Sequence, residues 1–450
     1  LSPTYPLMLN EIMNWDYGKN RGKYFLEGDY PINYVVDKGL MDVFLPKARS
    51  GWGLSRHVAN SERDDFNGTE TFTAGYLMST LKIGPQLTLL GGIRYEKYDM
   101  DYKSTFVYVT HSVDGVSLLF DTLNTVKRSD INWFPNIHLQ YKITDWADIR
   151  LAYSKAISRP DYQAIMPNIY YAPNEQTVFG NPYLKPTVIN NYDAAIYLYS
   201  NKIGLFTLSG FYKKMKDVFF QTRIYYQNLR FFETNLIDSA AFRSVGIRDL
   251  PEPSELITVY LNNPNPGYVR GFEVEWQSNF WYLPKPFNSL VLGINYTRTW
   301  SSMEYLRFEN IDSTYKQGPF TRHKYKTEIK TFKSRLLYQG DHILNITLGF
   351  DYKGFSGRIS YNLQDAVTSS IGLRPEEDAL TGTIPRWDIA IKQRLPIDGL
   401  SISFNGVNLF RKAIKTYRTF KRPNQTEAIS NLISTSYSPS FYELLLRYEF

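Results

Sequence analysis

Residues 86–98 read QLTLLGGIRYEKY, and apolar and polar side chains alternate along them. If the chain is extended here, one side carries Leu87, Leu89, Ile93 and Tyr95. The other side carries Thr88, Arg94 and Glu96. Successive side chains of a β-strand point to opposite faces, so this period of two predicts a strand with one apolar and one polar face.

The same alternation recurs along the chain, whereas helical periodicity is scarce. The sequence predicts thirteen strands, over residues 70–83, 86–98, 131–143, 148–157, 190–200, 204–216, 268–282, 288–300, 342–352, 355–364, 385–395, 399–410 and 440–450. Segments of about ten residues with alternating hydrophobicity are typical of strands that cross an outer membrane. The segments therefore favour an all-β protein over a helical one.

The connections between these strands alternate between tight and long. The tight ones are residues 84–85, 144–147, 201–203, 283–287, 353–354 and 396–398, and the long ones are 1–69, 99–130, 158–189, 217–267, 301–341 and 411–439. Outer-membrane barrels have short periplasmic turns and long extracellular loops, so we predict a transmembrane antiparallel β-barrel. Because such barrels contain an even number of strands, thirteen indicate one part of a larger barrel.

Composition agrees with a barrel and excludes several other classes. The chain has no cysteine, a formal net charge of +7, and 36 Tyr, 28 Phe and 8 Trp. Aromatic residues near strand ends, such as Tyr95, Tyr98 and Tyr141, would form the girdle at the membrane interface. The alternative is the core of a soluble β-domain, but no predicted helix is available to cover the apolar faces. No apolar run approaches the roughly 18 residues of a membrane helix.

Two stretches resemble the TonB-dependent receptor family of outer-membrane active transporters. Residues 152–160 read AYSKAISRP, and GNPYLKP follows at 180–186. Residues 404–410 read FNGVNLF, and the chain ends YELLLRYEF. The hairpin around DYKGF, residues 351–355, is similar to an element of receptors from Bacteroidetes-type bacteria. The resemblance covers nearly all of the chain from about residue 70 onward.

The resemblance implies a barrel of about 22 strands with a plugged lumen. On this reading residues 1–69 are mostly an extracellular loop, residues 70–450 are the C-terminal part of the barrel, and the plug domain is not present in this sequence. It also implies a barrel assembly signal at Tyr448 and Phe450. The motif residues of the extracellular loop are Arg159, Pro160, Asn181, Pro182, Leu184, Lys185 and Pro186.

Charged residues on the predicted polar faces are candidates for contact with the lumen or the plug. They are Arg94, Glu96, Arg150, Glu273, Glu275, Arg358, Asp388 and Arg394. The alternative for each residue is a hydrated barrel interior with salt bridges between neighbouring strands. The sequence does not decide between these two roles.

The sequence carries no sign of an enzyme. It has no Gly-rich phosphate loop, no HExxH, no GxSxG and no Cys-His metal spacing, so we expect no catalytic residue, cofactor or metal site. Acidic pairs at Asp64-Asp65 and Asp99/Asp101 are explained by solvation more simply than by calcium. The basic residues Arg411, Lys412, Lys415, Arg418, Lys421 and Arg422 would meet lipopolysaccharide or an anionic ligand rather than nucleic acid.

The resemblance implies a receptor in the outer membrane of a Gram-negative bacterium that imports a bulky, scarce nutrient, such as a siderophore, vitamin, glycan or peptide. Its expected partners are the TonB complex, through a missing N-terminal segment, the membrane lipid, and a surface lipoprotein. Two alternatives stay open at this point: a structural subunit of an outer-membrane complex and a passive porin. Loops diverge fastest, so the sequence does not identify the substrate.

Overall fold

The computed structural model describes residues 65–111, 117–167, 169–171, 177–225, 256–372, 374–420 and 429–449, with short stretches between residues 13 and 43. The chain divides into two units, Leu1–Glu62 and Arg63–Phe450. In the first unit, β1 (Met13–Asn14) pairs with β4 (Val35–Val36), and β2 (Tyr24–Phe25) pairs with β3 (Tyr30–Pro31), both antiparallel. Most of the predicted extracellular loop at 1–69 lies outside the described residues.

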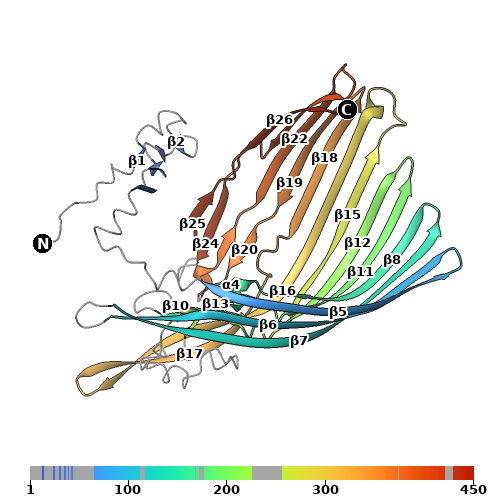
Figure 1. Ribbon diagram of the computed structural model, residues 1–450. Helices are drawn as coiled ribbons and strands as arrows, with labels where there is room; N and C mark the ends of the chain where they lie inside the picture. Colours follow the sequence, from blue (N-terminus) through green and yellow to red (C-terminus); the bar gives the residue numbers. More distant parts are fainter. Residues whose placement is uncertain are drawn as a thin grey trace. The chain divides into compact units, whose positions relative to one another are not determined.

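The second unit is built on one antiparallel sheet, in which all thirteen predicted strands are present. Neighbours follow the chain order, as Figure 1 shows from β5 in blue to β26 in red. The strands are β5 (Phe66–Ile83), β6 (Leu87–His111), β7 (Ser117–Thr144), β8 (Ala147–Ser158), β11 (Thr187–Ser200), β12 (Gly204–Lys216), β15 (Gly267–Asn279), β16 (Leu290–Gln317), β18 (His342–Tyr352), β19 (Phe355–Gln364), β22 (Ile384–Arg394), β23 (Leu400–Val407) and β26 (Phe441–Tyr448). No described helix is long and apolar enough to span a membrane.

Strand registers divide this sheet into two faces. Leu139 lies opposite Leu89 and Leu151, and the row continues on what we call the apolar face. Gln140 lies opposite Arg150, on what we call the polar face. Side chains alternate between the two faces along each strand. A register that puts one pair of residues on the same face therefore puts every second residue of both strands on that face. The alternation predicted from sequence is thus continuous across neighbouring strands.

The apolar face is exposed rather than packed. Ile196 and Leu208 are each 42% exposed, and Leu444 is 71% exposed. Aromatic rings run along one end of this face, with centroid distances of 4.9 Å for Tyr95–Trp133 and 5.1 Å for Tyr153–Tyr192. The predicted girdle includes Tyr95, but the placement of Tyr98 was wrong. Tyr98 belongs to the polar face and is only 5% exposed, because its ring packs within a cluster described below.

The tight turns lie where the sequence predicted them. Lys353 and Gly354 join β18 to β19 with φ of 46° and 80°. Two positive φ values suit a two-residue hairpin turn whose twist matches that of the strands. Gly204 opens β12 with φ of 78°, and a Cβ there would lie 2.0 Å from the carbonyl oxygen of Gln277. This turn therefore requires glycine for two reasons.

Two of the predicted long connections are mostly strand. Within 99–130, β6 and β7 stay paired up to His111 opposite Ser117, and within 301–341, β16 pairs with β17 (Phe320–Ser334). Both hairpins extend past the ends of neighbouring strands (Figure 1). Continued pairing satisfies the backbone N–H and C=O groups that an irregular loop would leave to water.

Shorter elements lie in the other connections. They are α4 (Tyr162–Ile165), β9 (Ile169–Tyr171), β10 (Thr177–Phe179), β13 (Phe219–Tyr225), β14 (Leu256–Asn262), η4 (Phe287–Ser289) and η5 (Pro375–Glu377). A separate sheet joins β20 (Val367–Ser370), β21 (Ala379–Thr381), β24 (Ile414–Phe420) and β25 (Ile429–Ser436). The predicted loop at 411–439 thus contributes two strands, β24 and β25, to a sheet that is separate from the main one.

Buried apolar residues gather beyond the girdle, in the extended hairpins and connections. One cluster contains Phe220, Met303, Tyr305, Leu336 and Ile371. Burial raises the pKa of Tyr305 to about 12, although the backbone N–H of Leu337 donates to its hydroxyl. These connections therefore have a packed core of their own.

Ion pairs tie the same region together. The guanidinium of Arg307, 5% exposed, donates to both carboxylate oxygens of Asp378 at 2.8 Å. Asp341 pairs with Arg298 and with Arg335, each at 3.2 Å. Burial would raise the pKa of Asp341, but hydrogen bonds from these two arginines hold it below its usual range.

Candidate functional site

The predicted lumen residues share the polar face of the sheet. Registers from β6 to β23 place on it Arg94, Glu96, Arg150, Glu273, Glu275, Arg358, Asp388 and Arg394. Most of them contact a polar neighbour on the same face. Arg150 pairs with Asp148 at 2.9 Å and Arg358 with Asp351 at 2.6 Å. Such pairs compensate part of the charge on this face, and contact with the lumen or a plug stays a prediction.

A shallow cavity of about 720 Å³ lies at the tight-turn end of β12, β15, β16 and β18. Amide and carboxylate groups line it, among them Glu275, Gln277, Asn295 and Asn345. Gln277 donates to Glu275 at 2.6 Å, and Asn295 donates to Glu273. Uncharged amides both donate and accept hydrogen bonds, so this wall suits water or a polar surface rather than an apolar ligand.

The motif loop, by which we mean the described residues of 159–186, folds back against strands β5 to β7. It opens with Arg159 and Pro160, directly after β8. Asp161 then caps α4, because its side chain accepts a hydrogen bond from the N–H of Ala164 at 2.9 Å. Proline lacks a donor and suits the end of a strand, so Pro160 separates β8 from this turn.

The second half of the motif is held by backbone and amide contacts. Asn181 is 3% exposed, and its side chain donates to the carbonyl of Tyr260 at 2.9 Å and accepts from the N–H of Tyr183 at 3.0 Å. Leu184, 2% exposed, belongs to an apolar cluster with Tyr98 and Tyr102. The asparagine and leucine of this motif therefore have structural roles.

Two residues that the sequence analysis did not single out fasten this segment. Arg128 of β7 donates to the carbonyls of Pro182 and Leu184 and pairs with Asp130 at 2.7 Å. Asn262 of β14 accepts from the N–H of Lys185 at 2.8 Å and donates to its carbonyl at 2.9 Å.

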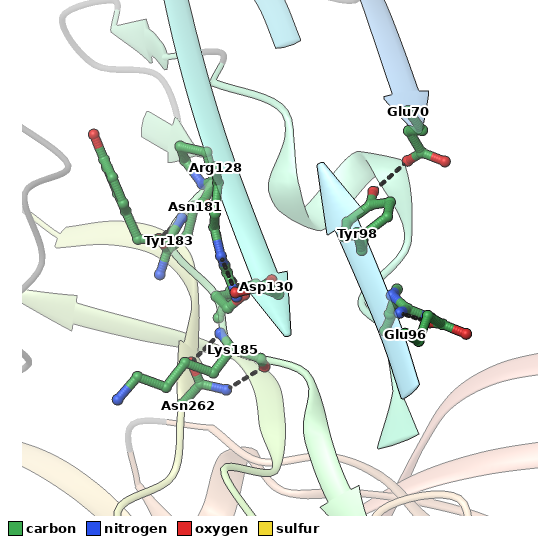
Figure 2. A network of polar contacts seen from close by, with 12 residues as sticks. Glu70, Glu96, Tyr98, Arg128, Asp130, Asn181, Tyr183, Lys185 and Asn262 are labelled. Atoms are coloured by element: carbon green, nitrogen blue, oxygen red, sulfur yellow. Dashed lines mark hydrogen bonds and ion pairs between the residues drawn. The ribbon is translucent and has the colours of Figure 1, made fainter. Parts of the chain in front are cut away.

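Figure 2 shows the Asn262 amide facing the Lys185 backbone while the Lys185 side chain points away. The backbone of position 185, rather than its charge, is what the fold uses. No local signal marks Asn262, because it lies 77 residues from its partner.

Arg159 joins the loop to the polar face. Its guanidinium donates to the carboxylate of Glu96, which also pairs with Arg94 at 3.1 Å. The same guanidinium lies 4.8 Å from the ring centre of Tyr98 and 5.3 Å from that of Phe72. Planar, delocalised arginine suits simultaneous stacking and carboxylate pairing, and lysine would not replace it. The structure thus brings together Arg94, Glu96 and Arg159, which the sequence had placed in two separate groups.

Next to Arg159, the carboxylate of Glu70 accepts hydrogen bonds from three tyrosines. Tyr98 donates at 2.6 Å, Tyr162 at 3.3 Å, and Tyr102 donates to the same oxygen as Tyr98 (Figure 2 shows the Tyr98 contact). Burial and the hydrogen bond to Glu70 raise the pKa of Tyr102 above its ordinary value. Glu70, Tyr98 and Tyr162 line a small cavity of about 240 Å³ together with other residues of the motif loop.

The motif loop therefore acts as a fixed brace between β5–β7 and the β13–β14 hairpin. Arg159 pairs with Glu96, and the backbone N–H groups of Asn181, Leu184 and Lys185 donate hydrogen bonds. The arrangement holds one end of the polar face in a defined shape.

The remaining predicted sites are not assembled into binding sites. Asp99 pairs with Lys97 and Asp101 with Lys127, each at 2.9 Å, which agrees with the non-calcium explanation. Among described residues, no group of three or more His, Asp or Glu side chains could hold a metal ion.

Two further sets of predicted residues are only partly described. Arg411, Lys412, Lys415 and Arg418 are exposed at or near β24, whereas Asp64, Lys421, Arg422 and Phe450 lie outside the described residues. Tyr448 ends β26 and is 52% exposed. Its part in barrel assembly stays a prediction.

Comparison with known proteins agrees with this geometry. A family model described as TonB dependent receptor-like, beta-barrel, matches residues 5–409. No curated protein sequence matches the chain. Among solved structures, the chain is similar to a double mutant of the Serratia marcescens hemophore receptor HasR in complex with its hemophore HasA and heme, with a TM-score of 0.50 and 13% identity over 77% of this chain and 49% of that one.

It is also similar to the siderophore receptor PiuA from Acinetobacter baumannii, with a TM-score of 0.50 and 12% identity over 85% of this chain and 44% of that one. At these identities the likeness concerns the fold. The chain spans less than half the length of either receptor.

Proposed function

Because the chain belongs to the TonB-dependent receptor family, we propose that it forms part of the barrel of an outer-membrane receptor that imports a bulky, scarce nutrient. Members of this family are transporters rather than enzymes. The observation that carries the proposal is the division of one continuous sheet into an exposed apolar face and a charge-compensated polar face. Lipid stabilises the first face, and water or a plug stabilises the second.

In this proposal the TonB complex supplies the energy through a segment N-terminal to the barrel. Polar-face residues such as Arg94 and Arg394 would contact a plug domain in the lumen. A surface lipoprotein is a further proposed partner, for which the long connections offer area. The proposed location is the outer membrane of a Gram-negative bacterium, with lipopolysaccharide around the barrel.

The nutrient class is proposed as a siderophore, heme compound, vitamin, glycan or peptide. The hemophore receptor and the siderophore receptor named above support testing siderophores and heme first. Bulky ligands are consistent with long connections that have a packed core, because a rigid surface loses less entropy on binding than a loose loop.

The sidedness of the sheet is tested by labelling single cysteines, since the chain has none of its own. Thr347 lies on the polar face, and its neighbour Leu348 lies on the apolar face, 47% exposed. In intact outer membranes a membrane-impermeant maleimide should react with Thr347→Cys where water in the lumen reaches that side chain. Leu348→Cys should face lipid and should not react. Equal labelling of both positions in folded protein would contradict the barrel orientation.

Transport is tested by deleting the gene and growing cells with each candidate nutrient as the limiting source. We expect slower growth on one class, and the same defect in cells that lack TonB. Uptake that continues without TonB would instead indicate a passive porin. Loss of an outer-membrane complex, with every nutrient still used, would indicate a structural subunit.

A further inference from the structure

The cavity of about 240 Å³ beside the motif loop lies on the polar face, at the long-connection end of β5 and β6. Strand registers place Glu70 opposite Met100 and Phe72 opposite Tyr98, and these four side chains line the cavity. They share the face of Glu96, which the proposed function assigns to the lumen. The cavity therefore lies on the side of the sheet along which a nutrient would pass.

Much of the cavity wall is apolar. Pro160 and Pro186 of the motif loop line it, together with Ile165 and Leu184, which are 6% and 2% exposed. Ile165 and Leu184 belong to a packed apolar cluster, so this part of the wall is formed before any ligand arrives. A pre-formed apolar wall favours a ligand group with a hydrocarbon stem.

The charges around the cavity have an excess of negative sign. Three carboxylates and two guanidinium groups line it, from Glu70, Asp130, Asp161, Arg128 and Arg159. Arg128 pairs with Asp130 at 2.7 Å, and Arg159 pairs with Glu96, which is not among the lining residues. Within the described part of the chain, neither Glu70 nor Asp161 forms an ion pair.

Neutral donors hold the carboxylate of Glu70 in place. Tyr98 and Tyr102 both donate to its Oε1 atom, and Figure 2 shows the first of these contacts. Its Oε2 atom accepts only the long hydrogen bond of 3.3 Å from Tyr162. The Oε2 atom therefore keeps the capacity to accept a hydrogen bond from a ligand. The ring of Tyr162 lies beside it and is 52% exposed.

We propose that this cavity binds a lysine side chain of a peptide, with its ammonium group on Oε2 of Glu70 and its methylenes against Ile165 and Leu184. An ammonium group forms charge-assisted hydrogen bonds with a carboxylate and is attracted to aromatic faces such as that of Tyr162. Lysine fits better than arginine, because a guanidinium group binds both carboxylate oxygens and Oε1 is already taken by two tyrosines. The inference rests on the proposed function and selects, from the nutrient classes named there, peptides that contain lysine.

The test titrates the intact receptor, purified in detergent, with a blocked tripeptide in a calorimeter. The probe is acetyl-Gly-Lys-Gly-amide, and its partner carries norleucine in place of lysine, which keeps the stem and removes the charge. We expect the wild type to bind the lysine peptide at least about tenfold more tightly, because hydrogen bonds to charged groups are among the stronger ones.

Two variants locate this preference in the cavity. Glu70→Gln keeps an acceptor for the tyrosines and removes the charge, so the two peptides should bind within about twofold of each other. Asp99→Asn is the control, because Asp99 lies on the apolar face of β6 and already pairs with Lys97 at 2.9 Å. It should keep the full preference for lysine.

Equal affinity of the wild type for both peptides would overturn the proposal, and this arm needs no variant. An unchanged preference in Glu70→Gln, or the same loss in the control, would overturn it as well. If free n-pentylamine bound as tightly as the lysine peptide, the assignment to a peptide would be wrong. The cysteine labelling at Thr347 and Leu348 and the growth test in cells without TonB do not involve Glu70, so the two proposals fail independently.

Discussion

Replacing Asn262 with alanine should loosen the motif loop without unfolding the sheet. The side chain makes three hydrogen bonds: it accepts from Lys185 N–H at 2.8 Å and donates to the carbonyls of Lys185 at 2.9 Å and Asp217 at 2.8 Å. At a partly exposed site each bond contributes roughly 0.5–1 kcal/mol, so their loss lowers the free energy of local opening by about 2 kcal/mol. Because about 1.4 kcal/mol is a factor of ten in an equilibrium constant, amide hydrogens that exchange through this local opening should exchange roughly 30-fold faster.

Hydrogen exchange at the amides of Tyr183 and Leu184 reads this opening. Both donate to Asn181, at 3.0 and 3.2 Å, so the substitution leaves their own hydrogen bonds in place. Their exchange reports whether the loop as a whole detaches. Asn279→Ala, at the exposed end of β15, is the matched control and should leave both amides unchanged. Exchange within about threefold of wild type in Asn262→Ala would refute the bracing role of this amide.

Three further substitutions probe other parts of the second unit. Asp378→Asn leaves the buried charge of Arg307 poorly compensated, and we expect the free energy of unfolding in a urea titration to fall by about 2–3 kcal/mol. This is below the usual cost of a broken buried pair because Asp378 is 30% exposed. An unchanged urea midpoint would argue against a stabilising role for this pair. The pKa of Asp341 is lowered in the folded state, so its stabilisation is present above its unfolded pKa and is lost as pH falls through the folded value. The difference in urea midpoint between wild type and Asp341→Asn should therefore shrink from pH 6 to pH 2, and a constant difference would contradict it. Gly204→Ala should abolish the heat-modifiable folded form, because the added Cβ would lie 2.0 Å from a backbone atom. Gly84→Ala has open space around it and should lower the free energy of unfolding by only about 1–2 kcal/mol, the cost of its positive φ.

The barrel strands could be predicted from sequence because their signal is local. Alternation over about ten residues is a property of one segment, and a tight turn such as Lys353-Gly354 fixes the register of two neighbouring strands. All thirteen predicted strands are present, although β5 begins four residues earlier, at Phe66 instead of 70. The two faces follow from the same alternation once the strands are paired.

The long connections were harder to interpret because polar composition does not distinguish a loop from an extended hairpin. Residues 99–111 continue β6 with Asp99, Asp101 and Lys103 alternating against Met100 and Tyr102. Polar residues in that run suggested a loop, yet pairing with β7 satisfies the backbone, and ion pairs such as Lys127–Asp101 compensate the charges. In the same way, no local pattern indicated that β24 and β25 would join β20 and β21 in a sheet.

By itself the sequence determined the strands, their apolar and polar sides, the tight turns and the motif that marks the loop after β8. Only the tertiary structure decided what the motif residues touch. Arg159 meets Glu96 across 63 residues, and Asn262 meets Lys185 across 77. Strand periodicity is set by the geometry of neighbouring peptide units, whereas these contacts depend on which distant segments the closed sheet brings within reach of one another.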